Sequence, residues 1–228
     1  MIAFDYVTRI YPGGGRALDG VHFEIDQSEF VLLTGPNGAG KTTVLKLIYL
    51  DELPDEGEVR IAFGAESLNT REEPTSARIQ RLRRHLGIVF QDFKLLQDRN
   101  VFENVALALR VADAPEARLQ KRVYEVLSLT GLSHKARSLP HELSSGEQQR
   151  VAIARAIANE PYVVLADEPT GNLDPETSRE ILKIFQNIHA AGTAVLMATH
   201  DYDLIAPLPY RRLHLEHGKL TDQKKPAE

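Results

Sequence analysis

Residues 30–48 read FVLLTGPNGAGKTTVLKLI, and this stretch decides the fold. The apolar run FVLLT is followed by the pattern GxxxxGKT, which leads into residues with helical periodicity. A strand that passes through such a glycine-rich turn into a helix is the P-loop arrangement. Backbone N–H groups of the turn and the positive end of the helix can bind phosphate oxygens. The stretch therefore predicts a phosphate-binding loop at the end of a buried strand.

The P-loop pattern also predicts what its side chains do. We expect Lys41 to reach the β- and γ-phosphates of a nucleotide, and the Thr42 hydroxyl to bind Mg²⁺. A glycine-rich turn that only caps a helix is the competing interpretation, and the flanking strand and helix count against it. The expected nucleotide-binding residues of this segment are Gly35, Pro36, Asn37, Gly38, Ala39, Gly40, Lys41, Thr42 and Thr43.

Two acidic residues follow a second apolar strand. Residues 163–166 read VVLA and lead directly into Asp167 and Glu168. Open α/β sheets bind ligands at the carboxyl ends of their strands, so these carboxylates are expected beside the P-loop. We expect Asp167 to hold Mg²⁺, commonly through water, and Glu168 to polarise the attacking water. The alternative is an ordinary acidic turn, which the pairing with a P-loop disfavours.

Composition excludes several classes of protein. The 228 residues are 43% hydrophobic and 26% charged, as in ordinary globular proteins, and contain no Cys, which removes disulfide scaffolds, zinc ribbons and thiol catalysis. The net charge of 27 − 32 = −5 makes nucleic acid an unfavourable partner. No apolar stretch approaches the ~20 residues of a spanning helix, and the N-terminus lacks the pattern of a secretory signal. We expect a chain that stays in the cytosol or sits on a membrane without crossing it.

Strand-like and helical patterns alternate along the chain. Strands are expected at 2–7, 21–25, 30–34, 58–63, 86–91, 162–167, 193–199 and 211–216. Helices are expected after residue 41 and at 77–85, 100–111, 116–130, 146–158 and 176–191. The pattern predicts one α/β domain over 1–228, with a mostly parallel core sheet formed by 1–91 and 160–228, an antiparallel N-terminal edge, and a helical subdomain at about 92–159. Lys224 and Lys225 are expected to lie in a frayed tail.

Residues 143–150, LSSGEQQR, resemble the signature motif of ATP-binding-cassette (ABC) ATPases. The other motifs of that family fall in order around it, from Tyr11 to His200. Tyr11 resembles the aromatic residue that stacks on adenine, and Gln91 resembles the Q-loop glutamine. Asp174, in GNLD, resembles the D-loop aspartate, and His200 resembles the switch histidine. The resemblance implies a P-loop ATPase that hydrolyses ATP with Mg²⁺, in which Glu168, His200, Gln91 and Lys41 are catalytic and Thr42, Gln91 and Asp167 serve the metal.

The signature segment is physically suited to bind an anion. Gly146 opens an amphipathic helix, whose N-terminus can face a phosphate. In the resembling family that phosphate belongs to ATP held by the other protomer, so two chains enclose two ATP molecules head to tail. The resemblance therefore implies a homodimer. The residues that it assigns to this shared site are Ser144, Ser145, Gly146, Glu147 and Asp174.

Two serines stand where the family commonly has glycine. Ser145 replaces the first glycine of the signature. If that position requires a positive φ, serine costs about 1–2 kcal/mol of strain; if it needs only a backbone N–H, serine serves. Ser28, before Glu29, is the second replacement, and only turn geometry is at stake there.

Within the family, residues 1–4, 11–14 and 90–99 resemble the ATPases of bacterial cell division. That resemblance implies a peripheral protein on the cytoplasmic side of the bacterial inner membrane, docked to an integral membrane partner of the FtsX type and regulating septal peptidoglycan hydrolysis. The region after Gln91, including Phe93, Leu95 and Leu96, is expected to form the partner's groove. Packing of these three residues within the helical subdomain is the competing interpretation.

Three other functions are considered. The first is the ATPase subunit of a lipoprotein-release or macrolide-export transporter, which shares several of the motifs. A non-hydrolysing scaffold conflicts with Glu168. An ABC ATPase of DNA repair needs long coiled-coil heptads, which the sequence lacks, so no nucleic-acid partner is expected.

Overall fold

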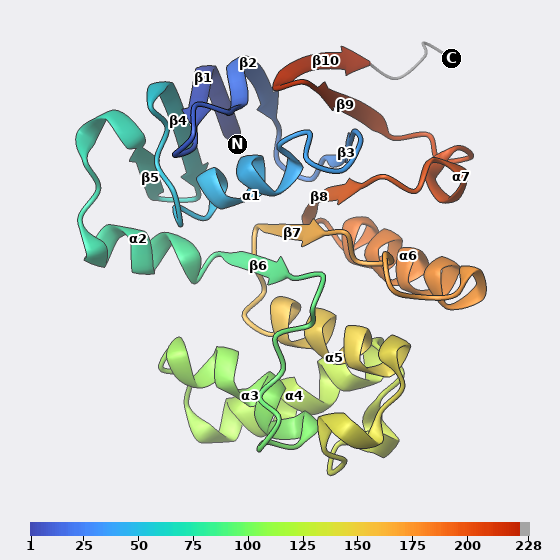
Figure 1. Cartoon of the computed structure of the whole chain (residues 1–228). Helices are drawn as coiled ribbons and strands as arrows, with labels where there is room; N and C mark the ends of the chain where they lie inside the picture. The colour runs from blue at the N-terminus through green and yellow to red at the C-terminus, as the bar shows by residue number, and fades with distance from the viewer. Residues whose placement is uncertain (224–228) are drawn as a thin grey trace.

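A computed structural model describes residues 1–223 and contains two sheets with a helix between them (Figure 1). The larger sheet has the strand order β10-β9-β3-β8-β7-β6. All neighbouring strands in it are parallel except β10, which pairs antiparallel with β9. Its strands are β3 (Phe30–Thr34), β6 (Leu86–Val89), β7 (Val163–Asp167), β8 (Ala194–Thr199), β9 (Arg211–Glu216) and β10 (Lys219–Gln223). The predicted mostly parallel core is confirmed.

The smaller sheet is antiparallel and belongs to the N-terminal part of the chain. Its strand order is β2-β1-β4-β5. The strands are β1 (Ile2–Ile10), β2 (Arg16–Ile25), β4 (Glu56–Phe63) and β5 (Glu66–Asn69). The expected antiparallel N-terminal subdomain is thus present, with a strand, β5, that the hydrophobic pattern did not predict.

The helices divide into those that cover the sheets and those that form a separate lobe. Helix α1 (Lys41–Ile48) lies between the two sheets, and α2 (Ser76–Arg83) leads into β6. Three helices lie between β6 and β7 in the chain and form the lower lobe in Figure 1: α3 (Val101–Val111), α4 (Glu116–Leu129) and α5 (Ser145–Ile157). Helices α6 (Pro175–Ala190) and α7 (Tyr202–Ile205) follow β7 and β8. No helix within residues 1–223 combines the length and the apolar character that crossing a membrane requires.

Strand β3 shows why the core sheet is buried on both faces. Phe30 and Leu32 belong to the apolar cluster that includes α6 and the helical lobe, whereas Val31 and Leu33 belong to the cluster that includes α1 and the antiparallel sheet. Because side chains alternate between the faces of a strand, a continuous apolar run is needed to fill both cores. Strand β3 is therefore buried along its whole length, and the P-loop follows its C-terminal end.

Two local predictions concern the turn at Ser28 and the helix start at Asp174. Ser28 has a φ of 57°, the left-handed region that glycine prefers, and its hydroxyl donates a hydrogen bond to the carbonyl of Gly192 at 2.8 Å. The serine thus occupies the turn that glycine commonly forms in the resembling family. Asp174 caps α6 by accepting hydrogen bonds from the backbone N–H groups of Glu176 and Thr177, each at 3.0 Å. Pro175 follows as the first helical residue, as the sequence predicts.

Candidate active site

The P-loop borders a pocket of about 330 Å³. The pocket brings together residues from distant parts of the chain: Tyr11, Ala17, Asn37, Gly38, Gly40, Lys41, Thr42, Thr43, Gln91 and Glu168. Two glycines of the P-loop are needed for its close approach to neighbouring backbone. A Cβ on Gly35 would clash with the carbonyl oxygen of Leu215, and a Cβ on Gly40 would clash with that of Ala17. Gly40 also has a φ of 105° and precedes the first residue of α1.

Lys41 is held inside this pocket and is only 6% exposed. Its Nζ donates hydrogen bonds to the carbonyl oxygens of Gly35 at 2.8 Å and Pro36 at 3.2 Å. It also lies 3.1 Å from Oε1 of Glu168, as an ion pair without hydrogen-bond alignment. The Lys41 ammonium group and the Glu168 carboxylate therefore lie next to each other beside the glycine-rich turn.

Glu168 connects the P-loop to the end of β8. Its Oε2 lies 2.9 Å from Nδ1 of His200 and accepts a hydrogen bond from the backbone N–H of His200 at 3.3 Å. The residue has a φ of 45°, an uncommon conformation for a non-glycine residue and a frequent one at functional sites. It also lines a second pocket of about 490 Å³ together with Thr170, Gly171 and His200. The carboxylate thus stands between the predicted lysine and the predicted histidine.

Asp167 ends β7 beside Thr42. Burial raises the pKa of this carboxyl, the charge of Glu168 raises it further, and a hydrogen bond from the Thr42 side chain opposes the shift. Its Oδ1 is buried and has no hydrogen-bond partner among residues 1–223. A buried carboxylate oxygen next to a hydroxyl is a donor set that suits Mg²⁺. The residues present therefore fit the predicted metal.

Comparisons with known proteins agree with this geometry. A family model described as "ABC transporter" matches residues 18–171. The chain belongs to the ABC transporter family. Over 97% of its length it is 49% identical to the "Cell division ATP-binding protein FtsE" of Mycobacterium tuberculosis, of which 94% is covered. It is also 47% identical to the protein of that name from Escherichia coli K12, with 96% of this chain and 97% of the relative covered.

A solved structure of an ABC cassette shows the same fold. The protein described as "Dimeric structure of a post-hydrolysis state of the ATP-binding cassette MJ0796 bound to ADP and Pi" superposes with a TM-score of 0.88. The two chains cover each other completely and are 34% identical. The predicted resemblance to ABC ATPases is therefore confirmed in sequence and in fold.

The ABC signature segment forms the N-terminus of α5 and lines neither pocket. Ser144 is the N-cap: its hydroxyl accepts a hydrogen bond from the N–H of Glu147 at 3.3 Å, and the Glu147 carboxylate accepts one from the N–H of Ser144 at 2.8 Å. The backbone hydrogen bond from Ser144 lowers the pKa of Glu147. Ser145 is the first helical residue and does not have a positive φ, so its replacement of glycine introduces no backbone strain.

Gly146 packs directly against the start of α6. A Cβ built on it would lie 2.5 Å from Cγ2 of Thr177, the residue whose backbone N–H is capped by Asp174. The signature segment and the helix start that Asp174 caps therefore lie next to each other. Ser144, Ser145, Gly146, Glu147 and Asp174 all lie outside the lining of that pocket in the single chain.

A separate cavity of about 490 Å³ lies between the core and the helical lobe. Its apolar lining includes Leu86, Ile88, Phe90, Leu107, Val111 and Ala156, and its basic lining consists of Arg83, Arg84, Lys94 and Arg155. Leu95 packs in the lobe's core, Phe93 packs partly against that core, and Leu96 is exposed. None of these three side chains lines the cavity.

Arg155, which was not predicted to be functional, connects α5 to the segment that follows Gln91. It donates hydrogen bonds to the carbonyls of Lys94 at 2.6 Å and Phe93 at 2.8 Å, and burial lowers its pKa. Both of these residues have positive φ values, 48° and 59°. The sequence hints at this role only by placing a basic residue within the apolar run AIARAIA. Its hydrogen-bond partners lie about 60 residues away, so these contacts could not be predicted from the sequence.

Proposed function

We propose that this chain is the ATP-binding and ATP-hydrolysing subunit of a membrane-associated ABC complex that regulates cell division through ATP-driven dimerisation. The observation that carries the proposal is the placement of Glu168 in the P-loop pocket, 3.1 Å from Lys41 and 2.9 Å from His200. The role in division is supported by the extent of the similarity to proteins named FtsE, which spans nearly the whole chain.

The pocket is suited to hold a nucleoside triphosphate along its length. Tyr11 offers an aromatic ring for the adenine, and Lys41 offers a cation for the β- and γ-phosphates. The backbone of the P-loop, with the N-terminus of α1, supplies N–H groups to the phosphate oxygens. The residues proposed for ATP binding in this segment are Gly35, Pro36, Asn37, Gly38, Ala39, Gly40, Lys41, Thr42 and Thr43.

Thr42, Gln91 and Asp167 are the residues that would hold Mg²⁺. When bound, the ion neutralises negative charge that develops on the phosphate oxygens. The orphaned Oδ1 of Asp167 is the observation that supports this assignment.

Glu168 is proposed to accept the proton of the water that attacks the γ-phosphate. His200 contacts the same carboxylate and would hold it in place, while Gln91 lines the pocket and would orient the water. Lys41 would stabilise the charge on the transferred phosphoryl group. ATP and water then yield ADP and phosphate.

A second copy of the chain is proposed to complete each site. Ser144, Ser145, Gly146, Glu147 and Asp174 lie at helix N-termini outside the pocket of their own chain; Ser144, Ser145 and Asp174 are exposed, Glu147 is half-buried and Gly146 is buried. Helix N-termini favour anions, so these segments can face the γ-phosphate held by a partner. The MJ0796 cassette, 34% identical to this chain, is described as dimeric.

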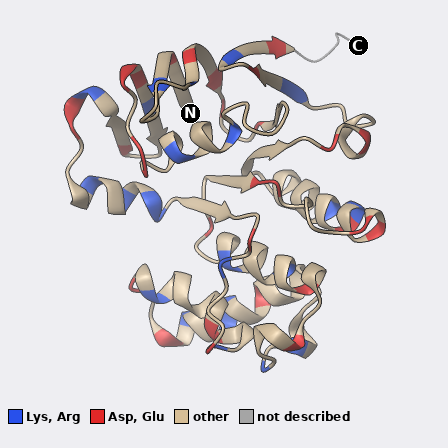
Figure 2. Cartoon of the chain, viewed as in Figure 1, with Lys and Arg blue, Asp and Glu red and all other residues tan. Residues whose placement is uncertain are grey.

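The membrane partner, an integral protein of the FtsX type, is proposed to dock in the apolar cavity between the core and the lobe, next to the segment after Gln91. Its apolar floor suits a short amphipathic helix, and the basic rim favours acidic residues beside that helix. The basic residues of α2, coloured blue in Figure 2, are all arginines, and Arg83 among them lines the cavity. Docking there would place the chain on the cytoplasmic side of the bacterial inner membrane as a peripheral protein.

We predict that Val111→Asp reduces capture of the membrane partner at least about tenfold, because docking would bury a carboxylate in place of an apolar side chain and that carboxylate would compete with acidic partner residues for the basic lining. Val111 is 61% exposed at the end of α3, so the substitution should leave the unfolding temperature nearly unchanged. Pull-down from detergent-solubilised membranes measures the effect. Leu129→Asp is the matched control, since Leu129 is 65% exposed on α4 and does not line the cavity. Equal capture by both variants would reject the docking site.

The function itself is tested by identifying the protein that co-purifies with the chain from membranes. An FtsX-like division protein supports the proposal. A permease of lipoprotein release or macrolide export would instead establish the alternative, a transporter subunit. The second outcome has some support, because the MJ0796 cassette is described as a bacterial ABC transporter cassette.

A further inference from the structure

The loop that carries Tyr11 cannot by itself fix the tyrosine ring. The residues after Tyr11 are Pro12 and three glycines, and a Cβ at any of these glycines would meet no atom within 4 Å. Among residues 1–223, the backbone hydrogen bonds of residues 11–15 stay within the loop: the N–H of Tyr11 donates to the carbonyl of Gly15 at 3.0 Å, and the N–H of Gly14 donates to the carbonyl of Tyr11 at 3.1 Å. The position of the ring must therefore depend on contacts of its side chain.

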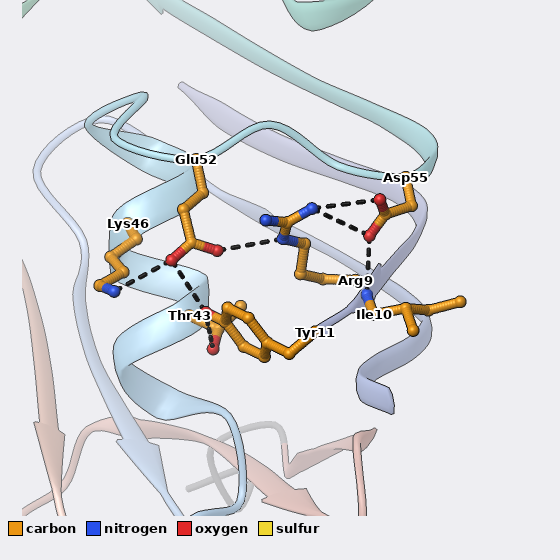
Figure 3. Close-up of polar contacts among 7 residues, drawn as sticks. All are labelled: Arg9, Ile10, Tyr11, Thr43, Lys46, Glu52 and Asp55. Atoms are coloured by element: carbon orange, nitrogen blue, oxygen red, sulfur yellow. Dashed lines mark hydrogen bonds and ion pairs between the residues drawn. The ribbon is translucent and has the colours of Figure 1, made fainter. Parts of the chain in front are cut away.

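Those contacts lead to Glu52 (Figure 3). The Tyr11 hydroxyl donates a hydrogen bond to Oε1 of Glu52 at 2.9 Å and lies 3.2 Å from the Thr43 hydroxyl. The guanidinium carbon of Arg9 lies over the Tyr11 ring, 5.3 Å from its centroid. The ring thus has a cation over one face while it lines the P-loop pocket.

Glu52 is the centre of this network. Besides Tyr11, its carboxylate accepts hydrogen bonds from Lys46 at 2.9 Å and from Arg9 at 3.0 Å. Burial opposes the charged form, but the hydrogen bonds from Lys46, Tyr11 and Arg9 outweigh it and lower the pKa of Glu52. Asp55 holds the other side of the Arg9 guanidinium, with both carboxylate oxygens at 3.1 Å.

The network also joins the ring to the phosphate-binding segment. Thr43 and Lys46 belong to α1, the helix that begins at the P-loop. Glu52 therefore connects the aromatic ring of one loop to the helix that would bind phosphate. Such a connection fixes the distance between the Tyr11 ring, which would contact the base, and the P-loop, which would contact the phosphates.

We infer that Glu52 is a positioning residue, which holds Tyr11 against the nucleobase and thereby sets the affinity for ATP. The inference rests on the proposed nucleotide site. In Glu52, Oε1 accepts from both Tyr11 and Lys46 and Oε2 accepts from Arg9, whereas the amide of Gln has only one acceptor oxygen and turns an N–H group toward one of these cations. Glu52→Gln should therefore break the set of charge-assisted hydrogen bonds that fixes the tyrosine hydroxyl, and so loosen the ring, without removing side-chain volume.

The test compares ATP with inorganic tripolyphosphate, which has phosphates but no base. Both are titrated with Mg²⁺ as competitors of a fluorescent ATP analogue. We expect Glu52→Gln to weaken ATP binding about fivefold to tenfold, as part of the base stacking is lost, and to leave tripolyphosphate binding unchanged. Tyr11→Phe should give the same pattern, because it removes only the hydroxyl. The double variant should lose little more than either single one.

Glu29→Gln is the matched control, because Glu29 also pairs with an arginine, Arg211, at 3.1 Å and is 25% exposed, against 14% for Glu52. It should change the affinity for neither ligand. If Glu52→Gln weakens the binding of ATP and of tripolyphosphate equally, Glu52 acts on α1 through Lys46. If ATP affinity is unchanged, Glu52 does not act on the Tyr11 ring. Either result overturns the inference. Wild-type protein that binds tripolyphosphate but not ATP also overturns it, and wild-type protein that binds neither rejects the proposed function itself.

Discussion

Glu168→Gln should lower the rate of ATP hydrolysis about 10²- to 10⁴-fold, the range that general acid–base catalysis contributes. The amide keeps the size of the side chain but cannot take a proton from water. Nucleotide binding should persist, because Lys41 keeps its hydrogen bonds to the carbonyls of Gly35 and Pro36. With hydrolysis blocked, we also expect ATP to accumulate between two subunits and to trap a dimer.

Phosphate release measures the first effect, and size-exclusion chromatography with ATP and Mg²⁺ measures the second. Glu125→Gln is the control, since Glu125 lies on α4, is 44% exposed at its side chain and forms only surface ion pairs. It should change neither turnover nor the elution volume. Turnover by Glu168→Gln at the wild-type rate would remove Glu168 as the base.

Lys41→Ala should weaken ATP binding about 10- to 100-fold, because hydrogen bonds to charged groups contribute about 1.5–3 kcal/mol each. The buried Nζ is the cation that meets the phosphates in the proposed site, and its loss also leaves Glu168 without its lysine partner. Both consequences act in the same pocket. Titration with a fluorescent ATP analogue measures the loss of affinity.

The matched control for this lysine is Lys121→Ala. Lys121 has a side chain that is 82% exposed on α4, so its removal should leave ATP affinity as it is in the wild type. Thermal unfolding checks that Lys41→Ala remains folded. A folded Lys41→Ala protein that binds the analogue with wild-type affinity but does not hydrolyse ATP would show that Lys41 acts in hydrolysis and not in ATP binding.

The elements that sequence reasoning predicted are those with a strong hydrophobic pattern. Strands β7 and β8 are continuous apolar runs because helices or a second sheet cover both of their faces. In β5 only Leu68 is buried, and β10 is an exposed edge strand, so neither has the pattern that buried strands share. Helix α7 has only four residues, too few to show helical periodicity.

The same distinction applies to the site. Lys41, Thr42, Asp167 and Glu168 could be selected because each belongs to a short local motif. The contact of Glu52 with Tyr11 could not be predicted, since 41 residues separate them and no local pattern pairs a carboxylate with a distant hydroxyl. The groove for the membrane partner near Phe93, Leu95 and Leu96 stays a prediction; none of these side chains lines the cavity that is proposed as the docking site.

The contact between Gly146 and Thr177 restricts which mutations this chain can accept. One added carbon at Gly146 would lie 2.5 Å from Cγ2 of Thr177, so even alanine would require the Thr177 side chain or the start of α6 to shift. The same displacement would reach the turn that Asp174 caps, and two segments assigned to the partner's nucleotide would shift together. Gly146 is therefore expected to tolerate substitution poorly, whereas the backbone of Ser145, an ordinary first helical residue, imposes no such restriction.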